Sequence, residues 1–235
     1  MKIKTIWASA ILLSSSFLAF NSHADGMPAM SHSLKQAATH EGEFDPRGYF
    51  TFRPDYRKCA SPLCGGLFVK AVNQKLTRCA NGRLQEECYV ATIRSQDDLD
   101  FTGASLLKGR IRSQTYPGFG NLGAFQLQAA YSSATDNAGS GKFVGLENNG
   151  LVCITSPCFS TDQYQLNSNK MRVISGLDLE QLGASEEIIN KAWAIMAEGG
   201  VLIASGVNKQ VAELAGTGVT FVVDQIYFPL GLQTK

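Results

Sequence analysis

Two short cysteine loops recur along the chain with the same internal spacing and the same downstream residue. The loops 59–64 and 153–158 each hold four residues, including Ser-Pro, between two cysteines. An asparagine follows nine residues later in both cases, at Asn73 and Asn167, and the matching positions are 94 residues apart. A repeat at a fixed separation indicates that the chain uses one structural unit twice.

The similarity continues beyond the cysteine loops. We predict two tandem copies of a small β unit, residues 47–133 and 142–235, joined by a linker of small residues at 134–141. Two copies that each expose an apolar face are expected to pack into one pseudo-symmetric, barrel- or sandwich-like body. Three further pairs stand 96 residues apart: Gly120 and Gly216, Phe125 and Phe221, and Tyr131 and Tyr227.

Local patterns predict a mostly β (α+β) fold with one helix in the second copy. The helix is expected at 186–198, because Ser185 suits its N-cap and Gly199 ends it. Its apolar stripe, which includes Trp193, is expected to face the core. Segments rich in β-branched and aromatic residues predict strands at 49–52, 67–72, 89–93, 106–111, 125–131, 143–146, 171–174, 201–204 and 219–228.

The first 24 residues have the pattern of a signal peptide. Lys2 and Lys4 precede an apolar run at 6–20, and small residues end at Ala24. We expect cleavage there, followed by a flexible leader at 25–46. The first cysteine lies far downstream, which argues against a lipid anchor, and the mature chain shows no transmembrane segment. These features predict a periplasmic or secreted protein.

Six cysteines in an exported chain predict three disulfides. Pairing between nearest neighbours is the simplest of the fifteen connectivities, and a structural zinc site is the alternative, although its usual short ligand spacing is absent. The middle pair encloses Asn81-Gly82, a hairpin signal that favours a bridge between neighbouring strands. The predicted pairs are Cys59 with Cys64, Cys79 with Cys88, and Cys153 with Cys158.

The predicted folded region contains no histidine, because His23, His32 and His40 all precede it. Histidine-dependent nucleophilic catalysis and histidine metal sites are thereby excluded from it. Ser105 and Lys108 match a Ser-x-x-Lys spacing, but their segment is predicted to be a strand. A calcium site at Asp97, Asp98 and Asp100 is the other candidate, and we favour a solvated turn there. We therefore assign no catalytic, cofactor or metal residue.

Basic residues are concentrated near the start of the first copy. Residues 47–83 contain eight basic side chains and one acid, whereas residues 84–235 contain ten basic and fifteen acidic side chains. This asymmetry indicates either a basic face for an anionic envelope component, such as lipopolysaccharide, or pairing with an acidic second copy. Nucleic acid is not an expected partner. The candidate recognition surface comprises Arg57, Lys58, Arg78 and Arg83.

The segment RKCASPLCGG at 57–66, the CYVA segment at 88–91 and the second cysteine loop together carry a family resemblance. The chain resembles an uncharacterised family of secreted bacterial proteins known only as a domain of unknown function. The resemblance implies one domain that spans both copies and export from a bacterial cell. It implies no activity.

These features predict an exported, non-catalytic binding or structural module of the bacterial envelope or secretome, whose partner is an anionic envelope component or an extracytoplasmic protein. One alternative is a protease inhibitor that presents a disulfide-tethered loop, because a rigid loop loses little entropy on binding. The other alternative is a histidine-free hydrolase that uses carboxylates or Ser105 with Lys108.

Overall fold

The structure is a computed structural model that describes residues 44–95 and 99–231. The signal peptide predicted at 1–24 and most of the leader predicted at 25–46 lie outside the described residues. The described residues belong to one compact unit, Phe44–Lys235. Phe44, which was expected in the leader, instead packs against the aromatic rings of Tyr49 and Tyr164.

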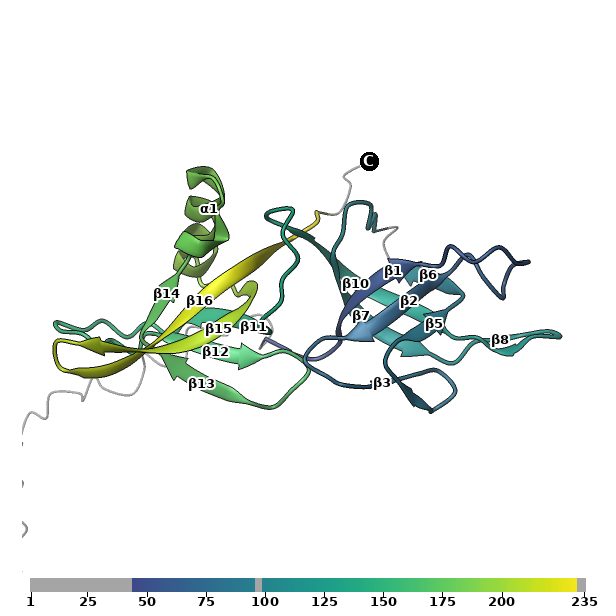
Figure 1. Cartoon of the computed structure of the whole chain (residues 1–235), viewed down its shortest axis with the longest axis horizontal. Coiled ribbons are helices and arrows are strands. Elements are labelled where there is room, and N and C mark those ends of the chain that lie inside the picture. The colour runs from purple at the N-terminus through teal and green to yellow at the C-terminus, as the bar shows by residue number, and fades with distance from the viewer. Residues whose placement is uncertain (1–43, 96–98, 232–235) are drawn as a thin grey trace, which may run out of the picture. The chain divides into compact units, whose positions relative to one another are not determined.

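The mostly β fold with one helix is confirmed (Figure 1). The first half contributes six strands to the main sheet: β1 (Tyr49–Pro54), β2 (Leu67–Ala71), β5 (Cys88–Val90), β6 (Thr92–Ser95), β7 (Leu106–Arg112) and β10 (Ala124–Ser133). The second half contributes β11 (Lys142–Asn148), β12 (Thr161–Gln165), β13 (Met171–Ile174), β14 (Gly176–Asp178), β15 (Leu202–Glu213) and β16 (Gly216–Pro229). Two small hairpins consist of β3 (Thr77–Arg78) with β4 (Leu84–Gln85), and β8 (Thr115–Tyr116) with β9 (Gly120–Asn121).

These twelve strands form one sheet along the path β13-β12-β11-β15-β16-β10-β7-β1-β2-β5. The strands β6 and β14 lie off this path and pair in parallel with β10 and β16, respectively. From the centre outward, the strand order is β10, β7, β1, β2, β5 in the first half and β16, β15, β11, β12, β13 in the second half. The last strand of each half lies at the centre. The path has two ends in the described part of the chain, so the sheet is open and does not close into a barrel.

The two halves meet where β10 pairs with β16. Ser132 lies opposite Phe228 at the centre of this short antiparallel ladder, between the pairs Tyr131–Pro229 and Ser133–Tyr227. The segment predicted as a linker, 134–141, follows β10 directly. The join between the halves is therefore made by continuous sheet hydrogen bonding.

The helix α1 (Glu186–Ala197) begins and ends within one residue of its predicted bounds. Ser185 caps it by accepting a hydrogen bond from the Ile188 amide at 3.4 Å. Ala192 and Met196, one turn apart, are buried against the sheet. Trp193 is 44% exposed, so the prediction that it belongs to the core is wrong. It lies about 100° around the helix from Ala192, which directs its ring away from the buried stripe.

Candidate functional site

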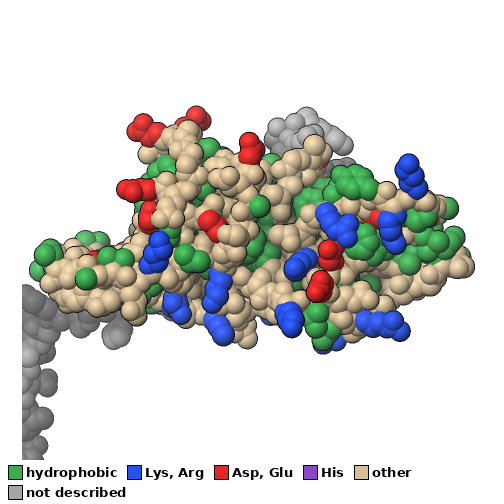
Figure 2. Space-filling view, in the orientation of Figure 1, with side chains coloured by type: hydrophobic (Ala, Val, Ile, Leu, Met, Phe, Trp, Pro, Cys, Tyr) green, Lys and Arg blue, Asp and Glu red, His purple; other side chains and the backbone are tan. Residues whose placement is uncertain are grey.

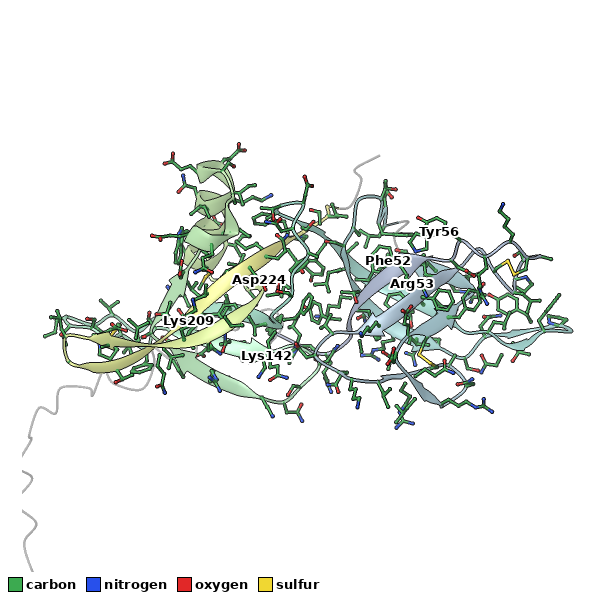
Figure 3. All side chains as sticks on the ribbon, viewed as in Figure 1. Phe52, Arg53, Tyr56, Lys142, Lys209 and Asp224 are labelled. Atoms are coloured by element: carbon green, nitrogen blue, oxygen red, sulfur yellow. A yellow bond between two sulfur atoms is a disulfide. The ribbon has the colours of Figure 1, made fainter. Side chains whose placement is uncertain are left out.

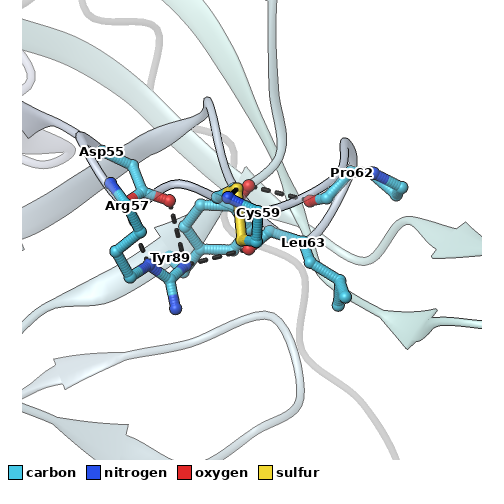
Figure 4. Close-up of a disulfide and its surroundings, with 7 residues drawn as sticks. Asp55, Arg57, Cys59, Pro62, Leu63 and Tyr89 are labelled. Atoms are coloured by element: carbon cyan, nitrogen blue, oxygen red, sulfur yellow. Dashed lines mark hydrogen bonds and ion pairs between the residues drawn. A yellow bond between two sulfur atoms is a disulfide. The ribbon is translucent and has the colours of Figure 1, made fainter.

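The loop between β1 and β2, residues 55–66, is the first candidate site (Figure 4). Its two ends are joined by a backbone hydrogen bond of 3.0 Å from the Asp55 amide to the Gly66 carbonyl. The disulfide between Cys59 and Cys64 closes the loop further out. A loop of this length is thus fixed at its base and at its middle.

Asp55 holds the first arm of this loop. Its side chain is only 1% exposed and accepts hydrogen bonds of 2.9 Å from both Nε and Nη2 of Arg57. The Arg57 guanidinium beside it lowers the pKa of the Asp55 carboxyl. Because a bidentate pair fixes both side chains, the chain direction at residues 55–57 is fixed with them.

Arg57 also links this arm to the rest of the loop. Its Nη2 donates a 2.9 Å hydrogen bond to the Leu63 carbonyl, and its guanidinium lies 5.2 Å from the ring centre of Tyr89. The Tyr89 hydroxyl in turn donates a 2.8 Å hydrogen bond to the Pro62 carbonyl. The outer part of the loop is therefore fastened to β5 by side chains as well as by the disulfide.

The side chains that this network leaves unused point into solvent. Tyr56 is 83% exposed, and Figure 3 shows it on the outside of the sheet. Leu63 is also exposed, and Lys58 is exposed and makes no ion pair with any described residue. The loop presents an aromatic, an apolar and a cationic side chain on a backbone whose conformation is already fixed.

The structure divides the candidate recognition surface between two elements. Arg57 and Lys58 lie in the loop at 55–66, whereas Arg78 and Arg83 belong to the β3–β4 hairpin. The disulfide from Cys79 attaches that hairpin to β5 at Cys88, and the loop contacts Tyr89. Neighbouring residues of a strand point to opposite faces of the sheet. The four basic residues therefore do not form one surface.

The ion pairs between described residues do not join the two halves. All three are local to the first half: Arg47 with Asp45, Arg53 with Glu87, and Arg57 with Asp55. Pairing of a basic first copy with an acidic second copy is thus not found among the residues that the structure describes. Arg57 is largely neutralised by Asp55, so Lys58 is the loop's uncompensated charge.

All six cysteines are paired as predicted, with α-carbons 5.7 Å apart for Cys59 and Cys64, 5.2 Å for Cys79 and Cys88, and 5.6 Å for Cys153 and Cys158. The third bridge closes a loop in which Ile154 is fully exposed, and Val152, just before the loop, is almost fully exposed. The turn between β15 and β16 contacts this loop through a 2.9 Å hydrogen bond from the Ala215 amide to the Ser156 carbonyl.

Ser105 and Lys108 do not contact each other through their polar atoms. The Ser105 hydroxyl donates to the Tyr131 carbonyl at 3.5 Å, and the Lys108 amine donates to the Asp45 carbonyl at 3.0 Å. Burial lowers the pKa of Lys108. The calcium candidates Asp97 and Asp98 lie outside the described residues. Across residues 44–95 and 99–231, no group of three or more histidine, cysteine, aspartate or glutamate side chains is placed to hold a metal ion.

Sequence reasoning missed two members of the loop network, Asp55 and Tyr89. The spacing of Asp55 and Arg57 was the available signal, because an aspartate often bonds the backbone two residues ahead. Tyr89 gave no signal, since its contact with the loop spans 27 residues. Its role depends on the pairing of β2 with β5.

Residues 48–233 match DUF6748, a domain of unknown function. The chain belongs to this family. The DUF6748 domain thus spans both halves of the sheet, from the residue before β1 to beyond β16, and it includes the loop at 55–66 and all three disulfides. No curated protein and no solved structure matches the chain. Among the described residues of the DUF6748 domain, no helix is long and apolar enough to cross a membrane.

Proposed function

We propose that this chain is an exported, non-catalytic binding module of the bacterial envelope or secretome, and that the loop at 55–66 contacts an extracytoplasmic partner protein. The observation that carries this proposal is Tyr56, a large aromatic side chain 83% exposed on a loop held by a disulfide and an ion pair. Aromatic side chains dominate the energy of many protein interfaces. A preformed loop also loses little conformational entropy when it binds.

Export is supported by two independent features. The N-terminal pattern of Lys2, Lys4 and an apolar run at 6–20 is typical of a signal peptide. All six cysteines lie at disulfide distance in pairs, and disulfides persist in oxidising compartments.

We also propose that the two halves are copies of one unit. The five residue pairs between β1 and β2, from Phe50–Ala71 to Pro54–Leu67, recur between β11 and β12 at a separation of 94. At the join, the pairs Tyr131–Pro229 and Ser133–Tyr227 are related by a shift of 96 residues in both partners. In this view the second half carries the second cysteine loop in the place of the first, and the two loops have diverged.

Site-specific photo-crosslinking in the native cell tests the binding role. A photoreactive amino acid replaces Tyr56 in one strain and Leu214 in a control strain, because Leu214 is 92% exposed on the β15–β16 turn far along the chain. We expect position 56 to yield a discrete crosslinked protein and Leu214 to yield none of the same mass. Lys58→Glu should reduce the yield from position 56, since it reverses the one uncompensated charge in the loop.

Two results would overturn the binding role. One is the absence of any crosslinked protein from positions 56, 58 and 63 in cells that export the protein with its bridges intact. The other is an identical set of products from position 56 and from Leu214, which would indicate random collisions.

A protease inhibitor is the second candidate, and the fixed conformation of the same loop favours it. An inhibitor loop must hold a substrate-like shape while it occupies a protease, and the bonds from Arg57 to Leu63 and from Tyr89 to Pro62 restrain this one from both sides. Assays against proteases of each mechanistic class would test it. Complete cleavage of the loop without inhibition would exclude this role.

A further inference from the structure

A groove on the second half of the sheet is lined by other types of side chain than the corresponding part of the first half. It lies over β11, β12, β13 and β15, with a cavity volume of about 630 Å³, which is within the usual range for small-ligand sites. Its lining includes the cations Lys142, Lys170 and Arg172, the amides of Gln163 and Asn208, and the buried ring of Phe221. It is separate from the loop at 55–66 and from the binding role proposed for that loop.

The β3–β4 hairpin covers the part of the first half that corresponds to β12 and β13, and a smaller groove of about 430 Å³ remains over β1 and β7. Val69 lies between Phe52 and Cys88 in the strand register, and Cys79 packs over this apolar cluster through the bridge to Cys88. A 3.1 Å hydrogen bond from the Asn121 amide to the Ala80 carbonyl holds the β3–β4 hairpin in place. That hairpin occupies the connection between β2 and β5.

The second half has no hairpin at this point, because only residues 166–170 connect β12 to β13. Gln163 takes the register position of Val69, between Leu146 and Arg172. Arg172, which is exposed, therefore occupies the position that corresponds to Cys88. Beside it, the amide of Gln163 replaces the apolar side chain of Val69. The sheet face that the first half covers with a disulfide-bonded hairpin is open in the second half.

The two floor amides, Gln163 and Asn208, hydrogen-bond to each other in both directions. Gln163 is 4% exposed, its Nε2 donates to Oδ1 of Asn208 at 3.3 Å, and Nδ2 of Asn208 donates back to its Oε1 at 2.9 Å. The two residues lie on β12 and β15, which β11 separates in the sheet. Burying an amide where an apolar residue would serve costs free energy, and departures of this kind are expected at functional sites.

The rim carries positive charge that no described residue neutralises. Lys142 and Arg172 are exposed, and neither they nor Lys170 form an ion pair within the described residues. No carboxylate lines the groove. Figure 2 shows basic side chains gathered over β12, β13 and β15, whereas acidic side chains gather at α1. Lys142, labelled in Figure 3, extends from β11 on this side. A groove with these charges favours an anionic ligand.

We propose that this groove binds an acidic saccharide, whose carboxylate or phosphate meets the rim cations and whose hydroxyl groups bond the floor amides. Amide side chains offer a donor and an acceptor together, which matches the two hydrogen-bonding roles of a sugar hydroxyl. Ammonium and guanidinium groups form the stronger, charge-assisted bonds to carboxylate or phosphate. A cationic ligand would be repelled by the three rim cations.

Calorimetry of the mature, disulfide-intact protein tests the proposal with carboxylated and phosphorylated oligosaccharides, each beside its neutral parent sugar. Polyglutamate serves as the acidic peptide comparison. We expect at least one acidic sugar to bind, its neutral parent to bind more weakly, and K142Q/R172Q to weaken binding by about tenfold or more. The matched control K70Q/R94Q removes the same charge from exposed positions in the first half, outside the groove and the loop at 55–66, and should leave affinity unchanged.

A second variant tests the floor separately from the charge. Asn208→Ile introduces the residue found at Ile111, the corresponding position of β7, and should abolish the preference for sugar over polyglutamate while the thermal midpoint shows that the fold is retained. Three outcomes would overturn the proposal. They are no preference for any acidic sugar over its parent, equal or tighter binding of polyglutamate, and equal losses in K142Q/R172Q and K70Q/R94Q. None of these bears on crosslinking from Tyr56.

Discussion

Asn73 and Asn167 make matching hydrogen bonds, each to the opposite half of the sheet. The Asn73 side chain bonds the Phe143 amide at 3.0 Å and the Phe143 carbonyl at 2.7 Å, and the Asn167 side chain bonds the Tyr49 amide at 3.0 Å and carbonyl at 2.6 Å. Both asparagines have a positive φ, 58° and 55°. Tyr49 and Phe143 are 94 residues apart, as are the two asparagines. Each asparagine thus bonds the backbone of the first strand in the opposite half.

This relationship predicts that Asn73 and Asn167 stabilise the join between the halves to a similar degree. Asn73→Gly and Asn167→Gly keep a residue that accepts positive φ but remove the side-chain bonds, so each should lower the free energy of unfolding by about 1–3 kcal/mol. Alanine at either position should cost more than glycine, because it adds backbone strain. Urea denaturation measures both effects. A glycine variant as stable as the parent would contradict the prediction.

The ion pair at Asp55 predicts a specific loss of stability in acid. Arg57 lowers the pKa of Asp55 in the folded protein, so this carboxylate contributes stability above its ordinary pKa of about 4 and loses it as pH falls through the lowered value. The stability difference between the parent and Asp55→Asn should be large at pH 7 and shrink below about pH 4. Denaturation curves across this range measure it, with the exposed Asp136→Asn as the control. A difference that stays constant with pH would rule out this role for the ion pair.

Gly65 and Gly66 stand where the loop enters β2, and alanine is predicted to lower stability to a different degree at each. A β-carbon at Gly66 would lie 2.1 Å from the Val90 carbonyl oxygen, so Gly66→Ala must shift the backbone and should be strongly destabilising. Gly65 has open space around it but a φ of +84°, so Gly65→Ala should cost only about 1–2 kcal/mol of strain. Thermal unfolding compares the two directly. Equal midpoints would show that contact with β5 does not constrain this position.

The bridge that covers the first half should contribute more stability than the bridge in the second cysteine loop. Cys88 is fully buried and packs with Val69 and Phe125, so replacing Cys79 and Cys88 with alanine should cost about 2–4 kcal/mol. The loop at 153–158 contains no buried residue, and alanine at both of its cysteines should cost less. Guanidinium unfolding of the two double variants tests the order. The reverse order would mean that the β3–β4 hairpin is not a cover for the core.

Local signals in the sequence were sufficient for some elements. The cap at Ser185 and the stop at Gly199 place α1 correctly, because both act through neighbouring backbone groups. The strand β13 has its predicted bounds, Met171–Ile174. The cysteine pairs also follow from proximity along the chain. The duplication inferred from the spacing stays a prediction, supported by the strand registers.

Other elements depend on partners distant in sequence. The strand β12 was not predicted, since TDQYQ is polar and becomes a strand only between β11 and β13. The strand β15 extends to Glu213, nine residues past its predicted end, because β16 pairs along its polar second half. The groove amide Gln163 carried one usable signal. It stands 94 residues after the apolar Val69, a difference that alignment of the two halves reveals.

Export with closed bridges underlies the proposed function, and non-reducing peptide mapping of the protein from its native cells tests it most directly. We expect a mature N-terminus at Asp25 and three linked pairs, Cys59–Cys64, Cys79–Cys88 and Cys153–Cys158. A protein that retains Met1, or that carries free thiols at these six positions, would contradict it.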